Sequence, residues 1–317
     1  MPKNKASNTL DLFSVSDLEE ARAHIPATVR RVVVASDTIQ QELPDRADFL
    51  HSVLCQVGMP RRKTEGRIFE RESGSVSIML EAGRLWNGRK FVEQPLPYGT
   101  RPRLVMVHIS SEAVRTQSRT IEIGESMRDF LIKLDIDPTG GVRGNYTMFR
   151  KQMEALAACR LIMVMTDGAR AVTVEAKPNK KFEAWVTFDG KQRSLWPGEL
   201  ELSEEFFETL ALHAVPLDHR ALGALKHSAL ALDIYTWLAH RLCRIRKAEG
   251  IKLSWSNLRD QFGQEYRDPK NFKKEFQQAL WQVHAVYPEA HIEDAMGGLI
   301  LKPSKPPLPK TTVQAVR

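Results

Sequence analysis

The feature that most constrains the fold of this chain is an order of elements that occurs twice. Hydrophobic periodicity between residues 95 and 200 predicts a helix, a short strand, a helix, a turn, a third helix and a β-hairpin. Between residues 201 and 305 the same order returns without obvious sequence identity between the two segments. This is the order of a winged helix, so the sequence predicts two such units in tandem.

The repeated order sets the expected fold class and domain boundaries. A chain of 317 residues is long enough for two or three domains. We expect an α+β fold, mainly α, with two tandem winged-helix (helix-turn-helix) domains at residues 95–200 and 201–305. Residues 1–94 form a small N-terminal region of undefined role, and residues 306–317 form a proline-rich tail.

The N-terminal region carries few strong signals. Residues 37–57 predict a helix that is broken or kinked at Pro44, because proline cannot donate the hydrogen bond of a helix interior. Alternating residues in 67–81 predict a β-hairpin around Gly74. The basic triplet at 61–63 is interpreted as part of a loop rather than as a site.

In the first repeat, the first two helices are expected at 103–114 and 127–134. A turn rich in glycine and proline follows, and Asn145 is expected to cap the third helix. Two β-rich runs flank an Asp-Gly pair at 167–168, which predicts a hairpin. Residues 182–188 are expected to add a further strand.

In the second repeat, one long helix is expected at 224–245. Ser254 suits the N-cap of the next helix, and Gly263 suits a left-handed cap at its end. The Asp-Pro pair at 268–269 opens the third helix with a cap and a proline at the first helical position. A second hairpin is predicted to turn at 297–298.

The third helix of each unit is the candidate DNA reader, because in a helix-turn-helix the second helix of the motif enters the major groove. With Phe272 pointing inward and about 100° per residue, one face of the second unit's helix is free of acids, since Glu275 lies to one side. Lysines on such a face suit phosphates or guanine, and glutamines suit adenine. The outward residues are Lys270, Lys274, Gln277, Gln278 and Trp281, with Lys273 on the flank.

The corresponding face of the first unit is weaker. Thr147, Arg150 and Lys151 point outward with Glu154 beside them, and Arg143 lies in the preceding turn within reach of a phosphate. This helix is interpreted either as a second DNA reader or as part of an interface. The alternative for both helices is an ordinary solvated face.

The distribution of charge favours an acidic partner such as DNA. The chain has a formal net charge of +7. Residues 216–317 carry 16 basic and 10 acidic side chains, so nearly the whole excess lies in the last third. Basic faces attract phosphate, although a charge of this size also fits a simple solvated surface.

Catalytic patterns are scarce. No phosphate-binding loop of the GxxxxGK[ST] form occurs, and the glycines between 140 and 144 fit a turn. His213 and His219 lie near Asp218, but no further ligand cluster supports a metal site. We therefore expect no catalytic residues, no cofactor and no metal.

The cysteines and the apolar runs indicate a cytoplasmic protein. Cys55, Cys159 and Cys243 are far apart in apolar helical patterns and are interpreted as reduced core residues. The N-terminus lacks the apolar stretch of a signal peptide, and no apolar run approaches the ~18 residues of a membrane helix. No membrane partner is expected.

Three stretches carry a resemblance to a known family: residues 96–134, residues 201–242, and SWSNLRDQFG at 254–263 with the helix after it. They resemble the RepA-type replication initiators of broad-host-range plasmids. The resemblance implies binding to repeated double-stranded origin sites, called iterons. It also implies opening of AT-rich DNA and recruitment of the host initiator DnaA and the replicative helicase. A homodimer that represses its own gene, with a monomer that starts replication, is implied as well.

Two other classes of function remain open. A transcriptional regulator would use the same DNA-binding elements without a role in replication, and direct repeats in an origin beside the gene would separate the two. An enzyme such as a nuclease or relaxase would need clustered carboxylates, histidines or tyrosines, which the sequence does not show convincingly.

Overall fold

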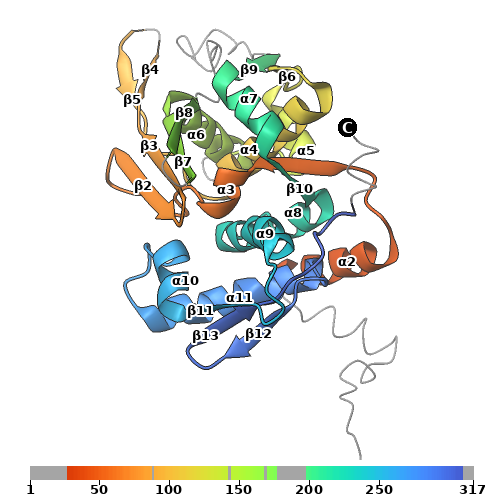
Figure 1. Cartoon of the computed structure of the whole chain (residues 1–317). Coiled ribbons are helices and arrows are strands. Elements are labelled where there is room, and N and C mark those ends of the chain that lie inside the picture. The colour runs from red at the N-terminus through yellow and green to blue at the C-terminus, as the bar shows by residue number, and fades with distance from the viewer. Residues whose placement is uncertain (1–26, 88, 142–143, 168–169, 177–197, 310–317) are drawn as a thin grey trace, which may run out of the picture.

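The computed structural model describes residues 27–87, 89–141, 144–167, 170–176 and 198–309. The strand expected at 182–188 and the candidate phosphate contact Arg143 lie outside the described residues, as does most of the proline-rich tail. Helices and strands alternate throughout, and the strands form several small sheets (Figure 1). The fold is therefore a mixed one of helices and sheets.

The N-terminal elements, in order, are α2 (Ala27–Gln41), β1 (Ala47–His51), α3 (Ser52–Gln56), β2 (Ile68–Ser73), β3 (Val76–Glu81), β4 (Arg84–Trp86) and β5 (Phe91–Glu93). The helix predicted at 37–57 is wrong, because α2 ends at Gln41 and a strand follows Pro44. That strand, β1, pairs with a distant partner and buries Phe49, which local periodicity does not reveal. The predicted hairpin is confirmed, and Gly74 in its turn has a φ of +60°.

The middle elements, in order, are α4 (Thr100–Thr116), β6 (Thr120–Glu122), α5 (Met127–Lys133), α6 (Asn145–Ala158), β7 (Arg160–Asp167), β8 (Arg170–Ala176) and β9 (Glu199–Glu201). The predicted order is present, but the cap of α6 is displaced by one residue. Gly144 is the N-cap, without a side-chain hydrogen bond. A Cβ atom at Gly144 would lie 2.0 Å from the carbonyl oxygen of Gly140, so the close turn requires glycine.

The C-terminal elements, in order, are α7 (Glu204–His213), β10 (Ala214–Asp218), α8 (His219–Leu225), α9 (Ala229–Arg241), η1 (Leu242–Arg244), β11 (Ile251–Ser254), α10 (Trp255–Phe262), α11 (Pro269–Val286), β12 (Ile292–Ala295) and β13 (Gly298–Leu301). The single helix expected at 224–245 is wrong. The chain leaves the helix after Leu225, and the side chain of Ser228 caps the new helix α9 by accepting the N–H of Ala231 at 3.1 Å.

The ends of α10 and α11 are specified locally. Ser254 caps α10 as predicted, and its side chain and that of Asn257 form a reciprocal capping box. Asp268 caps α11, accepting the N–H of Lys270 at 2.8 Å. The left-handed cap expected at Gly263 is wrong, because its φ is −107°. Glycine is required there for space, since a Cβ would lie 2.5 Å from the side chain of Arg259.

Strands of the N-terminal region complete sheets with later parts of the chain. β3 pairs with β7, giving a four-stranded antiparallel sheet in the order β2-β3-β7-β8, and β1 pairs with β10. In Figure 1 the orange N-terminal strands accordingly lie beside the green ones. β6 pairs with β9, whose last residue is Glu201. Strand pairing therefore crosses the predicted boundaries after residues 94 and 200.

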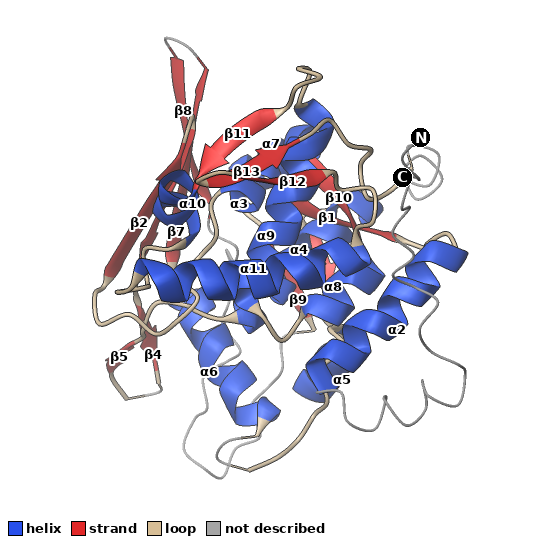
Figure 2. Ribbon diagram, turned by 90° about the horizontal axis from the view of Figure 1, so that it is seen from below, coloured by secondary structure: helices blue, strands red, loops and turns tan. Residues whose placement is uncertain are grey.

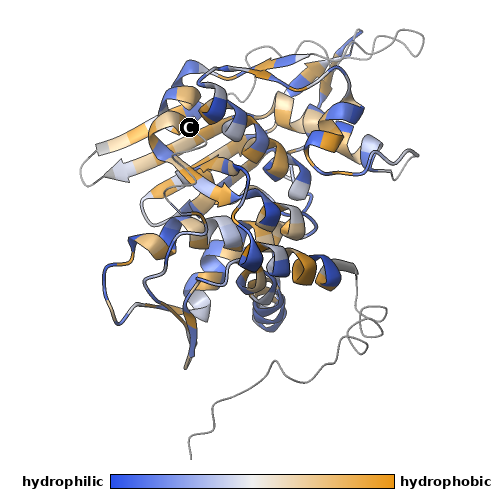
Figure 3. Ribbon diagram, turned by 90° about the vertical axis from the view of Figure 1, so that its right-hand side faces the viewer, coloured by the Kyte–Doolittle hydropathy of each residue, from blue (hydrophilic) through white to orange (hydrophobic). Residues whose placement is uncertain are grey.

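Helix α9 forms the centre of the core. Each of residues 230–239 is buried, and Figure 1 shows α9 in the middle of the molecule with α4 above it and α11 below it. A helix that is buried on all sides must be covered by several elements, here including α3, α8 and α11. Apolar residues gather along the strands and inner helices, while the outer helical turns are mostly hydrophilic (Figure 3).

Candidate nucleic-acid interface

Helix α11 presents the face that the sequence predicts. Phe272, Phe276 and Val283 are at most 1% exposed and hold the helix against the core. The helix lies across the surface seen in Figure 2, with α2 beside one of its ends. All five of its candidate DNA-binding side chains are exposed: Lys270, Lys273, Lys274, Gln277 and Gln278.

Aromatic packing fixes the rotation of α11. The ring of Phe272 lies 5.6 Å from that of Tyr266, and the ring of Phe276 lies 5.7 Å from that of Phe262 and 5.9 Å from that of Trp255. Edge-to-face and tilted pairs of this kind stabilise a defined geometry. The inward stripe of aromatic residues therefore determines which side chains of α11 point to solvent.

The charge on this face is positive because Glu275, the one acid of α11, lies beside the face and has partners elsewhere. Glu275 accepts a hydrogen bond from the Tyr266 hydroxyl at 2.6 Å and lies 3.8 Å from the guanidinium of Arg62. Among the described residues, no carboxylate forms an ion pair with Lys270 or Lys274. The face therefore keeps cations available for phosphate oxygens.

Arg62, which the sequence pattern places in a loop, lies beside α11 in the structure. Its guanidinium lies 5.2 Å from the centre of the Tyr266 ring, within cation–π range. The basic triplet at 61–63 was the only local signal. Its place beside a helix some 200 residues later depends on the fold, which the sequence pattern does not give.

The matching face of α6 is partly occupied by local contacts. The Thr147 hydroxyl donates to the carbonyl oxygen of Gly141 at 2.8 Å and so secures the preceding loop. Arg150 forms an ion pair with Glu154 at 3.4 Å. Lys151 is exposed, and the fourth candidate, Arg143, lies outside the described residues. The structure therefore leaves fewer cations available on α6 than on α11.

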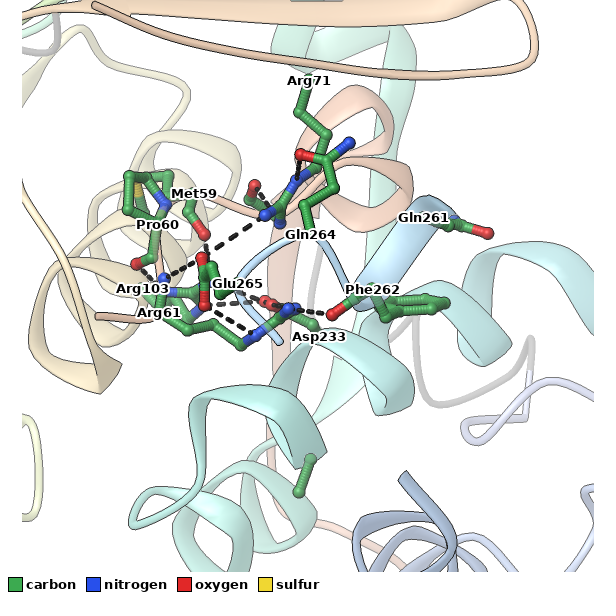
Figure 4. Close-up of polar contacts among 12 residues, drawn as sticks. Met59, Pro60, Arg61, Arg71, Arg103, Asp233, Gln261, Phe262, Gln264 and Glu265 are labelled. Atoms are coloured by element: carbon green, nitrogen blue, oxygen red, sulfur yellow. Dashed lines mark hydrogen bonds and ion pairs between the residues drawn. The ribbon is translucent and has the colours of Figure 1, made fainter. Parts of the chain in front are cut away.

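A buried network of arginines and acids joins α4, α9 and the segment around Arg61 (Figure 4). Asp233 of α9 accepts hydrogen bonds from Arg103 of α4 at 2.7 and 2.9 Å and from Arg61 at 3.3 Å. All three side chains are at most 8% exposed. A Cβ at Gly58 would lie 2.6 Å from the Asp233 carboxylate, so glycine at this position leaves room for the cluster.

The same network reaches the turn between α10 and α11. Glu265 in this turn accepts the backbone N–H of Arg61 at 2.9 Å and lies 3.4 Å from the guanidinium of Arg71. Arg71 also donates to Gln264 at 3.3 Å and to the carbonyl of Gly58 at 3.1 Å. Burial, with the neighbouring charge of Arg61, lowers the pKa of Arg71 to about 10. Buried charges therefore fasten the start of α11 to the N-terminal region.

The described residues do not form a metal site. No group of three or more histidines, cysteines, aspartates and glutamates in this part of the chain is placed to hold a metal ion. His219 lies 3.2 Å from the Asp45 carboxylate, whereas the ring centres of His213 and His51 are 5.9 Å apart.

The three cysteines Cys55, Cys159 and Cys243 are free, and burial raises the pKa of the Cys159 thiol to about 12. Within the described residues, no helix combines the length and apolar character needed to span a membrane.

Comparison with known proteins identifies the family. The family model for plasmid-encoded RepA proteins matches residues 96–257, about half of the chain. The chain therefore belongs to this family of plasmid replication proteins, which supports a role in the initiation of plasmid replication.

Among solved structures, the chain is similar to a crystal structure that contains domains 2 and 3 of RctB in selenomethionine form. The two chains are 11% identical with a TM-score of 0.46, and the match covers 79% of this chain and 96% of that one. A comparison with curated proteins found no match.

Proposed function

We propose that this protein is a plasmid replication initiator that binds repeated double-stranded origin sequences, iterons, through two winged-helix units. Membership of the plasmid-encoded RepA family supports the role in replication. The observation that carries the DNA-binding part is the exposed face of α11, whose lysines have no carboxylate partner among the described residues. Such a face favours phosphate and base-edge contacts.

The arrangement around α11 supports a winged-helix assignment for the second unit. Helix α9 is followed by β11, α10, α11 and the hairpin β12–β13, and the three strands pair in the order β11-β13-β12. In this assignment α10 and α11 are the helix-turn-helix, and the hairpin is the wing. In the first unit α5 and α6 take the corresponding places, with β7–β8 as the hairpin.

The proposed roles follow from side-chain chemistry. Lys270 and Lys274 contact phosphates, while Gln277 and Gln278 read adenine through paired hydrogen bonds. The ammonium of Lys273 lies 5.0 Å from the centre of the Trp255 ring. In the proposed complex Lys273 contacts the DNA phosphate backbone at the edge of the reading face. The wing contributes less, because Asp294 on β12 is exposed and repels phosphate, and the Lys302 ammonium lies 3.3 Å from the Glu293 carboxylate.

The later steps rest on the family alone. In the proposed scheme, binding opens adjacent AT-rich DNA and recruits the host initiator and the replicative helicase, and a homodimer represses the gene for the protein. The chain acts by binding, without a catalytic step, a cofactor or a metal.

The test uses the repeats that flank the gene. Gel-shift titrations would compare the repeat with a duplex of the same composition and scrambled order. We expect preference for the repeat in the wild type and its loss in Gln277→Ala/Gln278→Ala, while Gln40→Ala, an exposed glutamine on α2, serves as the matched control. Equal affinity of the wild type for both duplexes would contradict the proposal.

A plasmid-establishment assay separates an initiator from a transcriptional regulator. A minimal plasmid that carries only the flanking repeats and this gene should replicate with the wild-type protein and fail with Gln277→Ala/Gln278→Ala. Repeat binding without replication by the wild-type protein would favour the regulator.

A further inference from the structure

The hairpin β4–β5 exposes a pair of aromatic rings. Trp86 and Phe91 face each other across the two strands, with ring centres 5.2 Å apart and ring planes at 64°. Trp86 is 44% exposed and Phe91 is 66% exposed. Large aromatic residues usually gain most by burial, so two adjacent exposed rings indicate a binding surface.

The rings lie on the outer face of the hairpin. Opposite residues of an antiparallel pair share a face, and faces alternate along each strand. Leu85 and Val92, the neighbouring pair, are half-buried, and β4 contacts α6. The inner face therefore attaches the hairpin to the first unit, while Trp86 and Phe91 lie on the opposite face, where their rings contact each other.

The charge around the rings is positive. Glu93, the hairpin's one carboxylate, lies 2.7 Å from the guanidinium of Arg84 and 3.2 Å from that of Arg67. These arginines hold the pKa of Glu93 below its usual value, and two cations outweigh its charge. Arg89 and Lys90, next to the turn, are both exposed.

We propose that the β4–β5 hairpin is a second nucleic-acid site, which stacks unpaired bases of a separated DNA strand on Trp86 and Phe91. Arg89 and Lys90 at the turn lie along the phosphates of that strand. Single-stranded DNA is the fitting ligand because its bases expose their faces to aromatic rings, whereas in a duplex each base is covered by its neighbours. The inference rests on the proposed function, since an initiator that opens DNA creates such a strand beside its own site.

The first test measures binding of a fluorescein-labelled oligothymidylate of about 20 nucleotides, a length that exceeds a typical single-strand site. Trp86→Leu/Phe91→Leu keeps an apolar pair across the hairpin but removes both rings. We expect its affinity for the oligonucleotide to fall about tenfold to a hundredfold. Its affinity for the duplex repeat should stay within about twofold of the wild-type affinity. Such a change is far smaller than the tenfold change that corresponds to 1.4 kcal/mol.

Two control variants on α11 should retain binding to the oligonucleotide. Trp281→Leu removes an exposed tryptophan from α11 and should leave binding to the oligonucleotide unchanged. Lys274→Ala should weaken binding to the duplex and retain binding to the oligonucleotide. A thermal melt of Trp86→Leu/Phe91→Leu that matches the wild type shows that any loss of binding is not a loss of fold.

A second measurement does not depend on the folding of the double variant. A 5-iodouracil oligonucleotide cross-links to stacked aromatic residues under ultraviolet light, and with the wild-type protein the adduct should map to Trp86 or Phe91. Arg89→Ala/Lys90→Ala should flatten the salt dependence of oligonucleotide binding by a slope of about 1.4, as expected for two lost phosphate contacts on a single strand.

The outcomes distinguish this site from the duplex site. Equal oligonucleotide affinity for the wild type and Trp86→Leu/Phe91→Leu, or adducts confined to other segments, would overturn the inference. Parallel loss of duplex and single-strand binding in that variant would also overturn it, because the hairpin would then belong to the duplex site. If the wild type ignores the duplex repeat but binds the oligonucleotide through the hairpin, the proposed function fails and the hairpin site stands.

Discussion

Helices α11 and α6 hold the same place in the repeated order of elements, yet their outer faces differ. On α11 the lysines are exposed, and the one acid is turned to Tyr266 and Arg62. On α6 the Arg150 guanidinium is paired with Glu154 one turn away. Element order thus locates a candidate helix in the sequence, whereas the contacts around the helix decide which of its charged side chains remain unpaired among the described residues.

The two helices also differ in what holds their N-terminal ends. The turn before α11 is fastened by Glu265 to Arg61 and Arg71, which come from a distant part of the chain. The start of α6 has one local and one distant contact, since Asn145 donates to the carbonyl oxygen of Asp137 at 3.0 Å and accepts from Arg101 of α4 at 2.8 Å. The start of α11 is therefore held by buried ion pairs to distant residues, whereas Asn145 at the start of α6 is held by two hydrogen bonds.

The largest effect is expected where the anchor of α11 is removed. Asp233→Ala leaves Arg61 and Arg103 buried without their shared carboxylate, which should lower the free energy of unfolding by about 3–5 kcal/mol. Chemical unfolding measures this, with Asp260→Ala, an exposed aspartate on α10, as the control that stays within about 0.5 kcal/mol. A similar small change for Asp233→Ala would show that the buried network adds little to the stability of the fold.

The next effect compares the two proposed DNA-reading faces directly. Lys274→Ala should weaken binding to all duplexes and lower the salt slope by about one unit, whereas Lys151→Ala on α6 should do less. Gln277→Ala or Gln278→Ala should relax preference at one base pair by about 1–3 kcal/mol. Titrations over a range of salt concentrations provide the measurement. Equal losses for Lys274→Ala and Lys151→Ala would remove the distinction between the faces.

A smaller effect concerns pH and the first unit. Burial lowers the pKa of His108 on α4 to about 4, below its ordinary 6.5. Between these values the unfolded chain binds a proton that the folded chain excludes, so stability is complete above pH 6.5 and falls as the pH falls. Between pH 7 and 6 the loss due to His108 is about 0.7 kcal/mol.

Urea unfolding at pH 7 and pH 6 measures this loss of stability. His108→Gln should remove that part of the pH dependence, whereas His284→Gln, an exposed histidine on α11, should not. An unchanged pH dependence in His108→Gln would mean that His108 is protonated in the folded protein.

Removal of metal ions or nucleotide should have no effect on binding to DNA. Binding to the duplex repeat should be the same with EDTA and without added nucleotide, because no described residues form a metal cluster and the sequence has no phosphate-binding loop. The measurement is the same titration with chelator or without ATP. A strict need for either would apply to both units and would reopen the enzyme hypothesis.

Local signals predicted most elements of the two repeats, because helix caps, turns and hydrophobic helical stripes depend on residues that are close in the sequence. The cap at Ser254 and the inward stripe from Phe272 are of this kind. The strand β1 and the break at Ser228 were missed because they depend on pairing and packing with distant segments. For the same reason, the sequence showed the basic triplet containing Arg62 but not its place beside α11.

The most direct test asks whether both units read one duplex at a fixed offset. Recognition helices on one side of B-DNA lie about 34–36 Å, or 10–10.5 bp, apart, so inserting about 5 bp at the centre of the repeat turns one half-site away. With the full-length protein, affinity for the interrupted repeat should fall nearly to that for a single half-site, and protection should shrink from about two turns to one. Equal affinity for the intact and interrupted repeats would contradict the account and leave α11 as the sole reader.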